Sequence, residues 1–455
     1  MAEFKFYMFF VWVAAMALAC WSVEVARMFA RRMKKGGEQL KPAPPGANPA
    51  EQLPTPAVAV ILPIKGVDAD TRENLAALLA QAYPRYRLLF AVESQADPVI
   101  PLLQQIAPDA TPKAPPVEII TAGMATQRGQ KIHNQLAAIE RTTDADEILV
   151  FMDADARPSP QWLAELVKPL ASPSEGRGKP IGATTGFRFY VPEHPGKKLP
   201  DTFVSMINAA VAALLGPGWR NIAWGGSMAI RRADFYSFGV HDAWQHALSD
   251  DYVLSWCVQK KAKRRIQFVQ PCLVASSADF SWPGFWEFAV RQYKITRICA
   301  PGVWLAAVAA ASLYLVALVY TFTFWFLSLV GAVPATSLTG HVDHLLLVMF
   351  LALYVANILR GWLLLQGGIH GLPDHAPRLR PLIFWYTLGY PASLAVNLVA
   401  LLKSALGRTI EWRGVRYHMQ NRLKTTVERP AQDSSATAPP SAASPLSPSE
   451  SPLAP

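Results

Sequence analysis

Two carboxylates separated by one residue are the first candidates for chemistry in this chain. Asp153 and Asp155 follow residues 148–151, four apolar residues that fit a strand buried on both faces of an α/β sheet. Ligands bind beyond the carboxyl ends of strands in such sheets. Two carboxylates there can hold a hard cation, Mg²⁺ or Mn²⁺, which in turn holds two phosphates. The alternative is an acidic loop, because Asp favours turns and a Pro-Ser-Pro triplet follows.

A second acidic group lies further along the chain. Asp250 and Asp251, preceded by a serine, fall in the first turn of a helix predicted over residues 247–260. The simplest role for these side chains is to cap that helix, which Ser and Asp do well.

Two adjacent glycines, Gly225 and Gly226, interrupt an apolar stretch over residues 222–230. Glycine has no Cβ, so the backbone at this place can approach a ligand closely. An ordinary bulge or tight turn is the alternative.

These residues need a scaffold, and the pattern from residue 57 to about residue 277 predicts one. Strand-like and helix-like segments alternate, which indicates an α/β domain with a mostly parallel sheet covered by helices. The expected strands are 57–62, 86–92, 117–120, 148–151 and 181–191, and the expected helices are 71–81, 130–142, 201–215 and 247–260. The chain has no G-x-G-x-x-G after the first strand and no G-x-x-x-x-G-K-[ST]. The sequence therefore lacks the main motifs that would indicate a dinucleotide-dependent oxidoreductase or a P-loop enzyme.

Composition indicates a membrane protein. Apolar residues make up 51% of the 455 residues and charged residues 17%. The net charge of +10 comes from Lys and Arg beside apolar segments, which favours an anionic membrane surface or phosphate-bearing substrates over nucleic acid. The four cysteines have no metal-like or C-x-x-C spacing, which indicates reduced structural thiols.

The N-terminal apolar run, residues 6–23, has the length of a membrane span. A cleaved signal peptide is the alternative, but that would carry its charge before the apolar core, whereas most of the basic residues follow it here. We expect an uncleaved anchor with its basic end in the cytoplasm.

Further membrane segments occupy the second half of the chain. An interfacial helix is expected near residues 287–297, followed by apolar stretches at 302–333 and 344–366. The loop 334–343 has no Lys or Arg, so we expect it outside. Residues 382–406 are apolar but interrupted at 389–391, and we expect them to re-enter or to lie in the interface. This keeps the basic tail cytoplasmic.

Several motifs together resemble the inverting glycosyltransferases of the GT-A type, in particular the ceramide glucosyltransferase-like branch. They are PIKGVD at 63–68, YPRY at 83–86, QKIHN at 130–134, Asp153, the pair Asp250-Asp251, and IEWRGVRY at 410–417. The resemblance covers about residues 57–420. It implies a Rossmann-like GT-A domain, with a mostly parallel sheet that binds a nucleotide-sugar, joined to transmembrane helices.

The implied domains follow the chain from end to end. They are an anchor (1–26), a basic stretch and Pro/Gly-rich linker (27–56), a cytoplasmic glycosyltransferase domain (57–281), an interfacial helix (282–301), C-terminal membrane segments (302–406), a basic cytoplasmic tail (407–429) and a disordered tail (430–455).

The resemblance also implies roles for the acidic residues. Asp153 and Asp155 would hold the divalent cation against a diphosphate leaving group. Asp251 would be the general base that takes the proton of an acceptor hydroxyl as it attacks with inversion. Asp250 would either help to keep the carboxylate of Asp251 in the charge state that the reaction needs or contact the acceptor.

The remaining site residues would bind substrate. Asp68 and Glu93 would contact the nucleoside, and Lys131 the nucleotide or its phosphates. Diphosphate would be bound from the membrane side by the basic residues of the interfacial helix, for which lipid headgroups are equally good partners. The full substrate-binding set is Lys65, Asp68, Glu93, Lys131, Asp153, Asp155, Gly225, Gly226, Arg291, Gln292, Lys294 and Arg297.

Two residues depart from the family pattern. Glu93 stands where the family has an Asp after the second strand, and its extra methylene changes the reach of the carboxylate. The interfacial motif keeps positive charge at Arg291 and Lys294 but lacks the family's Trp. The second change bears on the class of acceptor.

The leading hypothesis is a multi-pass membrane enzyme with a cytoplasmic catalytic domain. It would transfer a sugar, with glucose as the candidate, from a nucleotide-sugar, with a UDP-sugar as the candidate, to a membrane lipid such as ceramide. A processive polysaccharide synthase is the second reading, disfavoured by the few spans and the missing Trp. A non-catalytic membrane protein that binds nucleotide-sugars is the third.

Overall fold

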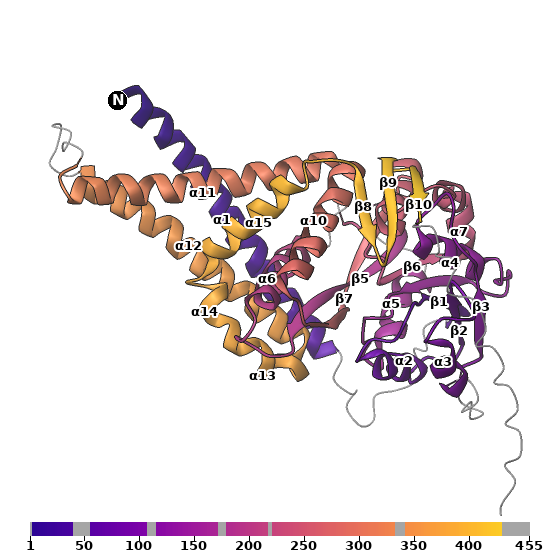
Figure 1. The fold of residues 1–455 in the computed structure, drawn as a ribbon. Coiled ribbons are helices and arrows are strands. Elements are labelled where there is room, and N and C mark those ends of the chain that lie inside the picture. Colours follow the sequence, from indigo (N-terminus) through magenta and orange to yellow (C-terminus); the bar gives the residue numbers. More distant parts are fainter. Residues whose placement is uncertain are drawn as a thin grey trace, which may run out of the picture.

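The computed structural model describes residues 2–39, 55–106, 115–171, 179–216, 221–332 and 342–429 (Figure 1). A mixed sheet with helices lies at one end of the molecule and long helices extend from the other. Most of the predicted linker and the predicted disordered tail, 430–455, fall outside the described residues.

Seven strands form the central sheet, in the order β3-β2-β1-β4-β6-β5-β7. Only β6 runs antiparallel to its neighbours, and the other pairs are parallel. The strands are β1 (Val58–Pro63), β2 (Tyr86–Val92), β3 (Val117–Thr121), β4 (Ile148–Met152), β5 (Ile181–Pro192), β6 (Ser227–Arg231) and β7 (Arg265–Ala278). The predicted fold class, an α/β domain with a mostly parallel sheet, is confirmed.

Side chains that alternate along the strands build two cores, one on each face of the sheet. In β1, Val58, Val60 and Leu62 pack on one face, and Ala59 and Ile61 on the other. The first face is covered by α2 (Thr71–Leu79), α3 (Ile100–Ile106) and α5 (Trp162–Ala171). The second is covered by α4 (Gln130–Ile139), α7 (Arg232–Ser237), α8 (Val240–Trp244) and α9 (Asp250–Trp256). Both faces are thereby removed from water, as a parallel sheet requires.

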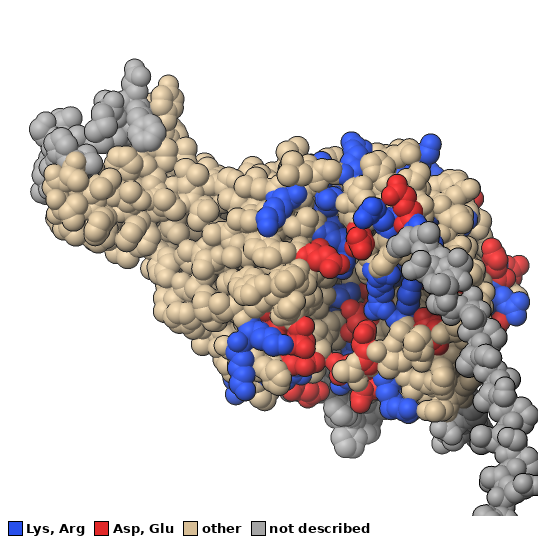
Figure 2. All heavy atoms as spheres, viewed as in Figure 1, with Lys and Arg blue, Asp and Glu red and all other residues tan. Residues whose placement is uncertain are grey.

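Three helices are long and apolar enough to cross a membrane within the described ranges: α1 (Ala2–Gln39), α11 (Pro301–Leu329) and α12 (Val342–Gly371). α1 runs without a break through the basic stretch that we assigned to the linker, so the anchor and that stretch form one helix. In Figure 2 charged side chains gather over the sheet domain, whereas the outer ends of α11 and α12 show none on this face. This distribution is compatible with a membrane protein.

The predicted interruption near residue 389 is a bend. A helical segment over Pro373–Tyr386, which ends in α14 (Ile383–Tyr386), meets α15 (Tyr390–Lys403) at 88°, a geometry of either a broken span or a re-entrant loop. α6 (Leu199–Leu214) and α10 (Trp282–Cys299) lie between these helices and strands β5 and β7, and share one apolar core with them.

The predicted basic tail, 407–429, contains a second sheet that the sequence analysis did not foresee. It comprises β8 (Thr409–Trp412), β9 (Val415–Asn421) and β10 (Lys424–Glu428), all antiparallel. This C-terminal sheet packs against α10 and the residues before α9 (Figure 1).

Candidate active site

Most of the predicted site residues meet at one edge of the central sheet. β1, β2 and β4 are parallel neighbours, so the residues after their carboxyl ends share an edge. Lys65 follows β1, Glu93 follows β2 and Asp153 follows β4. β6 runs the other way and pairs Ser227 with Met152, which brings the glycines before β6 to the same edge.

Lys131 lies at the centre of this edge. It belongs to the first turn of α4, and its Nζ is 2.7 Å from Oδ1 of Asp153 and 2.9 Å from Oδ2 of Asp250. Burial alone would lower the pKa of Lys131, but the two carboxylates outweigh it and raise the pKa. Gln135, one helical turn further along α4, donates to the same oxygen of Asp250 at 3.0 Å. Lys131 therefore joins the two acidic groups that the sequence placed far apart.

Arg188, in β5, is a site residue that the sequence analysis missed. Its guanidinium is 2.9 Å from Oδ2 of Asp153 and 3.0 Å from Oδ2 of Asp155. It also donates to the Tyr190 hydroxyl at 2.7 Å and lies 4.7 Å from the centre of the Trp224 ring. The sequence signal that could have found it is an arginine within an otherwise uncharged strand, because arginine is rarely buried without a partner.

These contacts test whether Asp153 and Asp155 fit a divalent cation. Both oxygens of Asp153 have cationic partners, Lys131 and Arg188, and Oδ2 of Asp155 faces Arg188 as well. Across the described part of the chain, no group of three or more His, Cys, Asp or Glu side chains is placed to hold a metal ion. In this arrangement the positive charges beside the two carboxylates are those of Lys131 and Arg188, and a cation at the pair would have to displace Arg188.

The two glycines make room for the ion-pair network and for Trp224. A Cβ at Gly225 would lie 2.5 Å from Oδ2 of Asp250 and 2.7 Å from Nζ of Lys131. A Cβ at Gly226 would lie 2.1 Å from the Trp224 ring. The sequence analysis predicted that the backbone here approaches a ligand closely. The structure shows a close approach to the side chains of Asp250, Lys131 and Trp224.

Asp251, beside the network, has the environment of a base. Ser249 caps α9, and its hydroxyl donates to Oδ1 of Asp251, which also accepts from the Tyr252 backbone N–H at 2.7 Å. Burial, and then the neighbouring Asp250, raise the pKa of Asp251 to about 6. The carboxyl is thus poised to accept a proton at neutral pH.

A second polar cluster forms beyond β1 and β2. Lys65 Nζ is 2.8 Å from Oε2 of Glu93, and Arg429, which follows β10, is 2.5 Å from Oε1. Burial would raise the pKa of Glu93, but the two cations outweigh it and lower the pKa. Arg413 bonds the carbonyl of Lys65 and lies 3.5 Å from Asp68. The sequence analysis assigned no role to either arginine.

The predicted basic residues of the interfacial helix point to the C-terminal sheet. Lys294 donates to the Thr409 carbonyl at 3.0 Å, and Arg297 donates to the Gly407 carbonyl. Arg291 pairs with Glu287 at 3.0 Å and lies 5.9 Å from the Trp412 ring. The backbone carbonyl of Gln292 accepts from Thr296 at 2.9 Å. None of the four residues is seen to bond Asp153 or Asp155 in the described structure.

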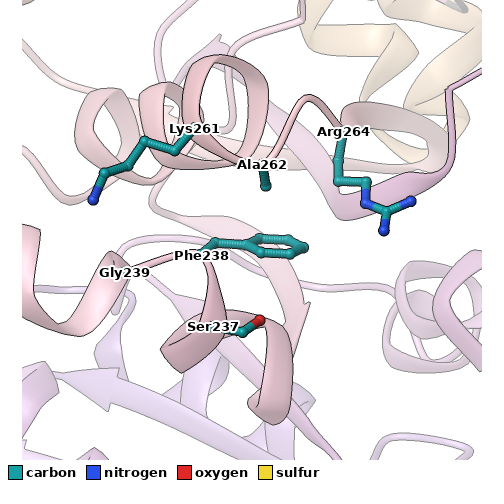
Figure 3. Close-up of a pocket in the computed structure, with 6 residues that line it drawn as sticks. All are labelled: Ser237, Phe238, Gly239, Lys261, Ala262 and Arg264. Carbon is teal, nitrogen blue, oxygen red and sulfur yellow. The ribbon is translucent and has the colours of Figure 1, made fainter.

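A hollow elsewhere on the domain lies away from this chemistry (Figure 3). It is lined by Ser237, Phe238, Gly239, Lys261, Ala262 and Arg264. Arg264 precedes β7, whose start pairs with the start of β5, so the hollow lies at the amino ends of the parallel strands. Active sites of open α/β sheets lie at the opposite edge.

Comparison with known proteins identifies the family. The sequence profile of glycosyl transferase family 21 matches residues 8–425. The chain belongs to glycosyl transferase family 21. The predicted resemblance is confirmed, and the match extends into the C-terminal sheet, to Thr425 at the start of β10. No curated protein sequence matches this glycosyltransferase.

Solved structures with similar folds include two that are named as enzymes. The mannosyltransferase PcManGT from Pyrobaculum calidifontis, with GDP-Man and Mn²⁺, is 18% identical, with 87% of this chain and 97% of that chain covered and a TM-score of 0.41. Glucosyl-3-phosphoglycerate synthase from Mycobacterium tuberculosis, with Mn²⁺ and UDP, is 15% identical, with 53% and 80% covered and a TM-score of 0.31. S. aureus TarS 1–349 is 11% identical, with 82% and 99% covered and a TM-score of 0.34.

The environment of Asp251 predicts how the rate of this family 21 enzyme depends on pH. If Asp251 is the general base that the resemblance implies, it must be deprotonated to act, so the rate should fall as pH falls through about 6. Asp251→Asn should lose roughly 10²–10⁴-fold in turnover, while nucleotide affinity changes little. Steady-state rates across pH and nucleotide titration of the same preparation measure both. Turnover near the wild-type value in Asp251→Asn would exclude Asp251 as the base.

Proposed function

We propose that this family 21 enzyme transfers a sugar, with inversion, from a nucleotide-sugar to a hydroxyl of a membrane lipid. Glucose, a UDP-sugar and ceramide are the candidate sugar, donor and acceptor. The observation that carries the proposal is the single network through Lys131, which ties the donor-side carboxylate Asp153 to Asp250 beside the base Asp251. Inverting transfer needs these two functions within one substrate length of each other.

The leaving diphosphate gains charge as the glycosidic bond breaks, and the site holds cations to meet it. Lys131 and Arg188 lie at the end of β4, and Lys65 and Arg429 beyond β1 and β2. Asp251 takes the proton of the acceptor hydroxyl as the oxygen attacks the anomeric carbon from the opposite face. Asp250, which pairs with Lys131, lies beside Asp251 and helps to raise the pKa of that carboxyl group.

A lipid acceptor is supported by what lies next to the network. The Tyr190 hydroxyl bonds Arg188, and its ring lies 5.8 Å from that of Phe280 and 5.7 Å from that of Phe288 in α10. This aromatic cluster continues into the apolar core shared with α6 and α12. We therefore place the lipid acceptor on this apolar side of the network.

The experiment that tests the proposal presents the purified enzyme in lipid with a panel of radiolabelled nucleotide-sugars. Transfer to a lipid puts label into the organic phase. Label in a water-soluble polymer would instead indicate a polysaccharide synthase. No transfer from any donor to either product would contradict the proposal.

The predicted Mg²⁺ or Mn²⁺ at Asp153 and Asp155 leads to a prediction about Arg188. If the guanidinium occupies the place of the cation, Arg188→Gln should bind Mn²⁺ at least ~10-fold more tightly than the wild type. The reason is that the substitution removes the positive charge that competes with Mn²⁺ for the two carboxylates. Electron paramagnetic resonance of free Mn²⁺ measures the affinity without an assay of activity. The control Arg188→Gln/Asp155→Asn should lose the gain. Equal affinity in wild type and Arg188→Gln would contradict this competition.

Topology gives a second prediction. We propose that the sheet domain and residues after 407 lie on the cytoplasmic side, where nucleotide-sugars are made, so 382–406 does not cross the membrane. A single-cysteine probe within 334–343 should react with an impermeant reagent from outside, and one placed after Tyr417 should not. The native cysteines are replaced first. Outside labelling of the second probe would show a complete crossing by residues 382–406.

A further inference from the structure

The hairpin turn between β8 and β9 holds an arginine in an unfavourable backbone conformation. Trp412 pairs with Val415, which leaves a two-residue turn of Arg413 and Gly414. φ is +49° at Arg413 and +76° at Gly414, and a type I′ hairpin turn requires positive φ at both positions. Asn, Asp or Gly is preferred at the first position. An arginine at this unfavourable position suggests the hypothesis that its side chain has a function in binding or catalysis.

The guanidinium of Arg413 reaches the loop after β1, at the edge of the sheet where the site lies. It donates to the carbonyl of Lys65 and lies 3.5 Å from Oδ2 of Asp68. A guanidinium has five N–H donors in a planar fork, and this side chain is 46% exposed. The guanidinium uses its donors for one carbonyl and one long contact only. Its other N–H groups can therefore donate to an anion bound in the site.

The rest of the C-terminal sheet fixes the turn in place. Four of its side chains are buried: Ile410, Val415, Tyr417 and Met419. They form a core cluster with Leu248, which precedes α9, and with Cys299, the last residue of α10. The Tyr417 hydroxyl accepts from the backbone N–H of Gln130, the residue before Lys131. The C-terminal sheet is thus packed against the site, and it holds Arg413 at the donor edge, the edge of the central sheet where Lys65 and Glu93 lie.

We propose that Arg413 is a binding residue for the diphosphate of the nucleotide-sugar and that the C-terminal sheet exists in this position to present it. The inference rests on the proposed function, because it takes the donor to lie along Lys65, Glu93 and Asp153. When a nucleoside diphosphate binds, the guanidinium exchanges the Lys65 carbonyl for phosphate oxygens, which its fork fits in a bidentate manner.

Arg413→Asn separates this role from a structural one, because the two roles predict opposite results. Asn-Gly is a favoured type I′ pair, so the Tm of the nucleotide-free enzyme should stay the same or rise. The affinity for UDP or GDP, measured by calorimetry on the full chain in detergent, should fall roughly 10- to 100-fold, the range for one bond to a charged group. Arg413→Gly, which also suits the turn, should lose as much affinity.

Arg416→Gln is the matched control. Arg416 lies in β9, where it is exposed between the buried Val415 and Tyr417, with its guanidinium 4.0 Å from Glu411. This variant therefore removes an equal charge from the exposed side of the same sheet. Its nucleotide affinity should equal that of the wild type. Unchanged affinity in Arg413→Asn, or an equal loss in Arg416→Gln, would overturn the proposal.

The result also distinguishes this inference from the proposed function. If Asp251→Asn abolishes sugar transfer while Arg413→Asn binds nucleotide normally, only the role of Arg413 fails. If the wild type binds neither UDP nor GDP, the proposed function fails, and the role of Arg413 with it.

Discussion

An ammonium group held between two carboxylates, Lys131 between Asp153 and Asp250, constrains the rest of the site. Removing one partner of a buried ion pair leaves an uncompensated charge, at a cost of roughly 3–5 kcal/mol. The end of β4, the start of α4 and the start of α9 must therefore meet within hydrogen-bonding distance. Gly225 is required at the same point, because a Cβ there would collide with both Lys131 and Asp250.

Other contacts extend this network toward the places proposed for the two substrates. Arg188 connects Asp153 to Tyr190 and so to the aromatic residues of α10, on the side of the apolar helices. The C-terminal sheet connects α10, through Lys294, to the donor side at Glu93, through Arg429. In the proposed function, the donor site, the base and α10 are thereby connected, which is what transfer between a water-soluble donor and a lipid acceptor would need.

The sequence predicted features that depend on local pattern. Apolar runs and periodicity located β1 to β5 and the long helices, but not β6 and β7. The end of the fourth strand located Asp153, whereas Lys65 and Glu93 came from the family resemblance. The contacts of Lys131 and Arg188 could not be predicted in the same way, because they depend on which strands become neighbours. The C-terminal sheet was missed because its strands are short and rich in charged residues, so their pattern resembles that of a basic tail. Its strands are stabilised by long-range contacts with Leu248 and Cys299.

Lys131 also allows the most direct test of whether donor site and base act as one unit. Lys131→Gln removes the cation that faces Asp153 and that helps to lower the pKa of Asp251. The nucleotide affinity and the pH–rate profile should be measured on the same variant. Coupling through Lys131 predicts that affinity falls and that the acid limb of the profile moves to higher pH, because loss of a nearby cation raises the pKa of a carboxyl group. A loss of affinity with the acid limb unmoved would contradict it.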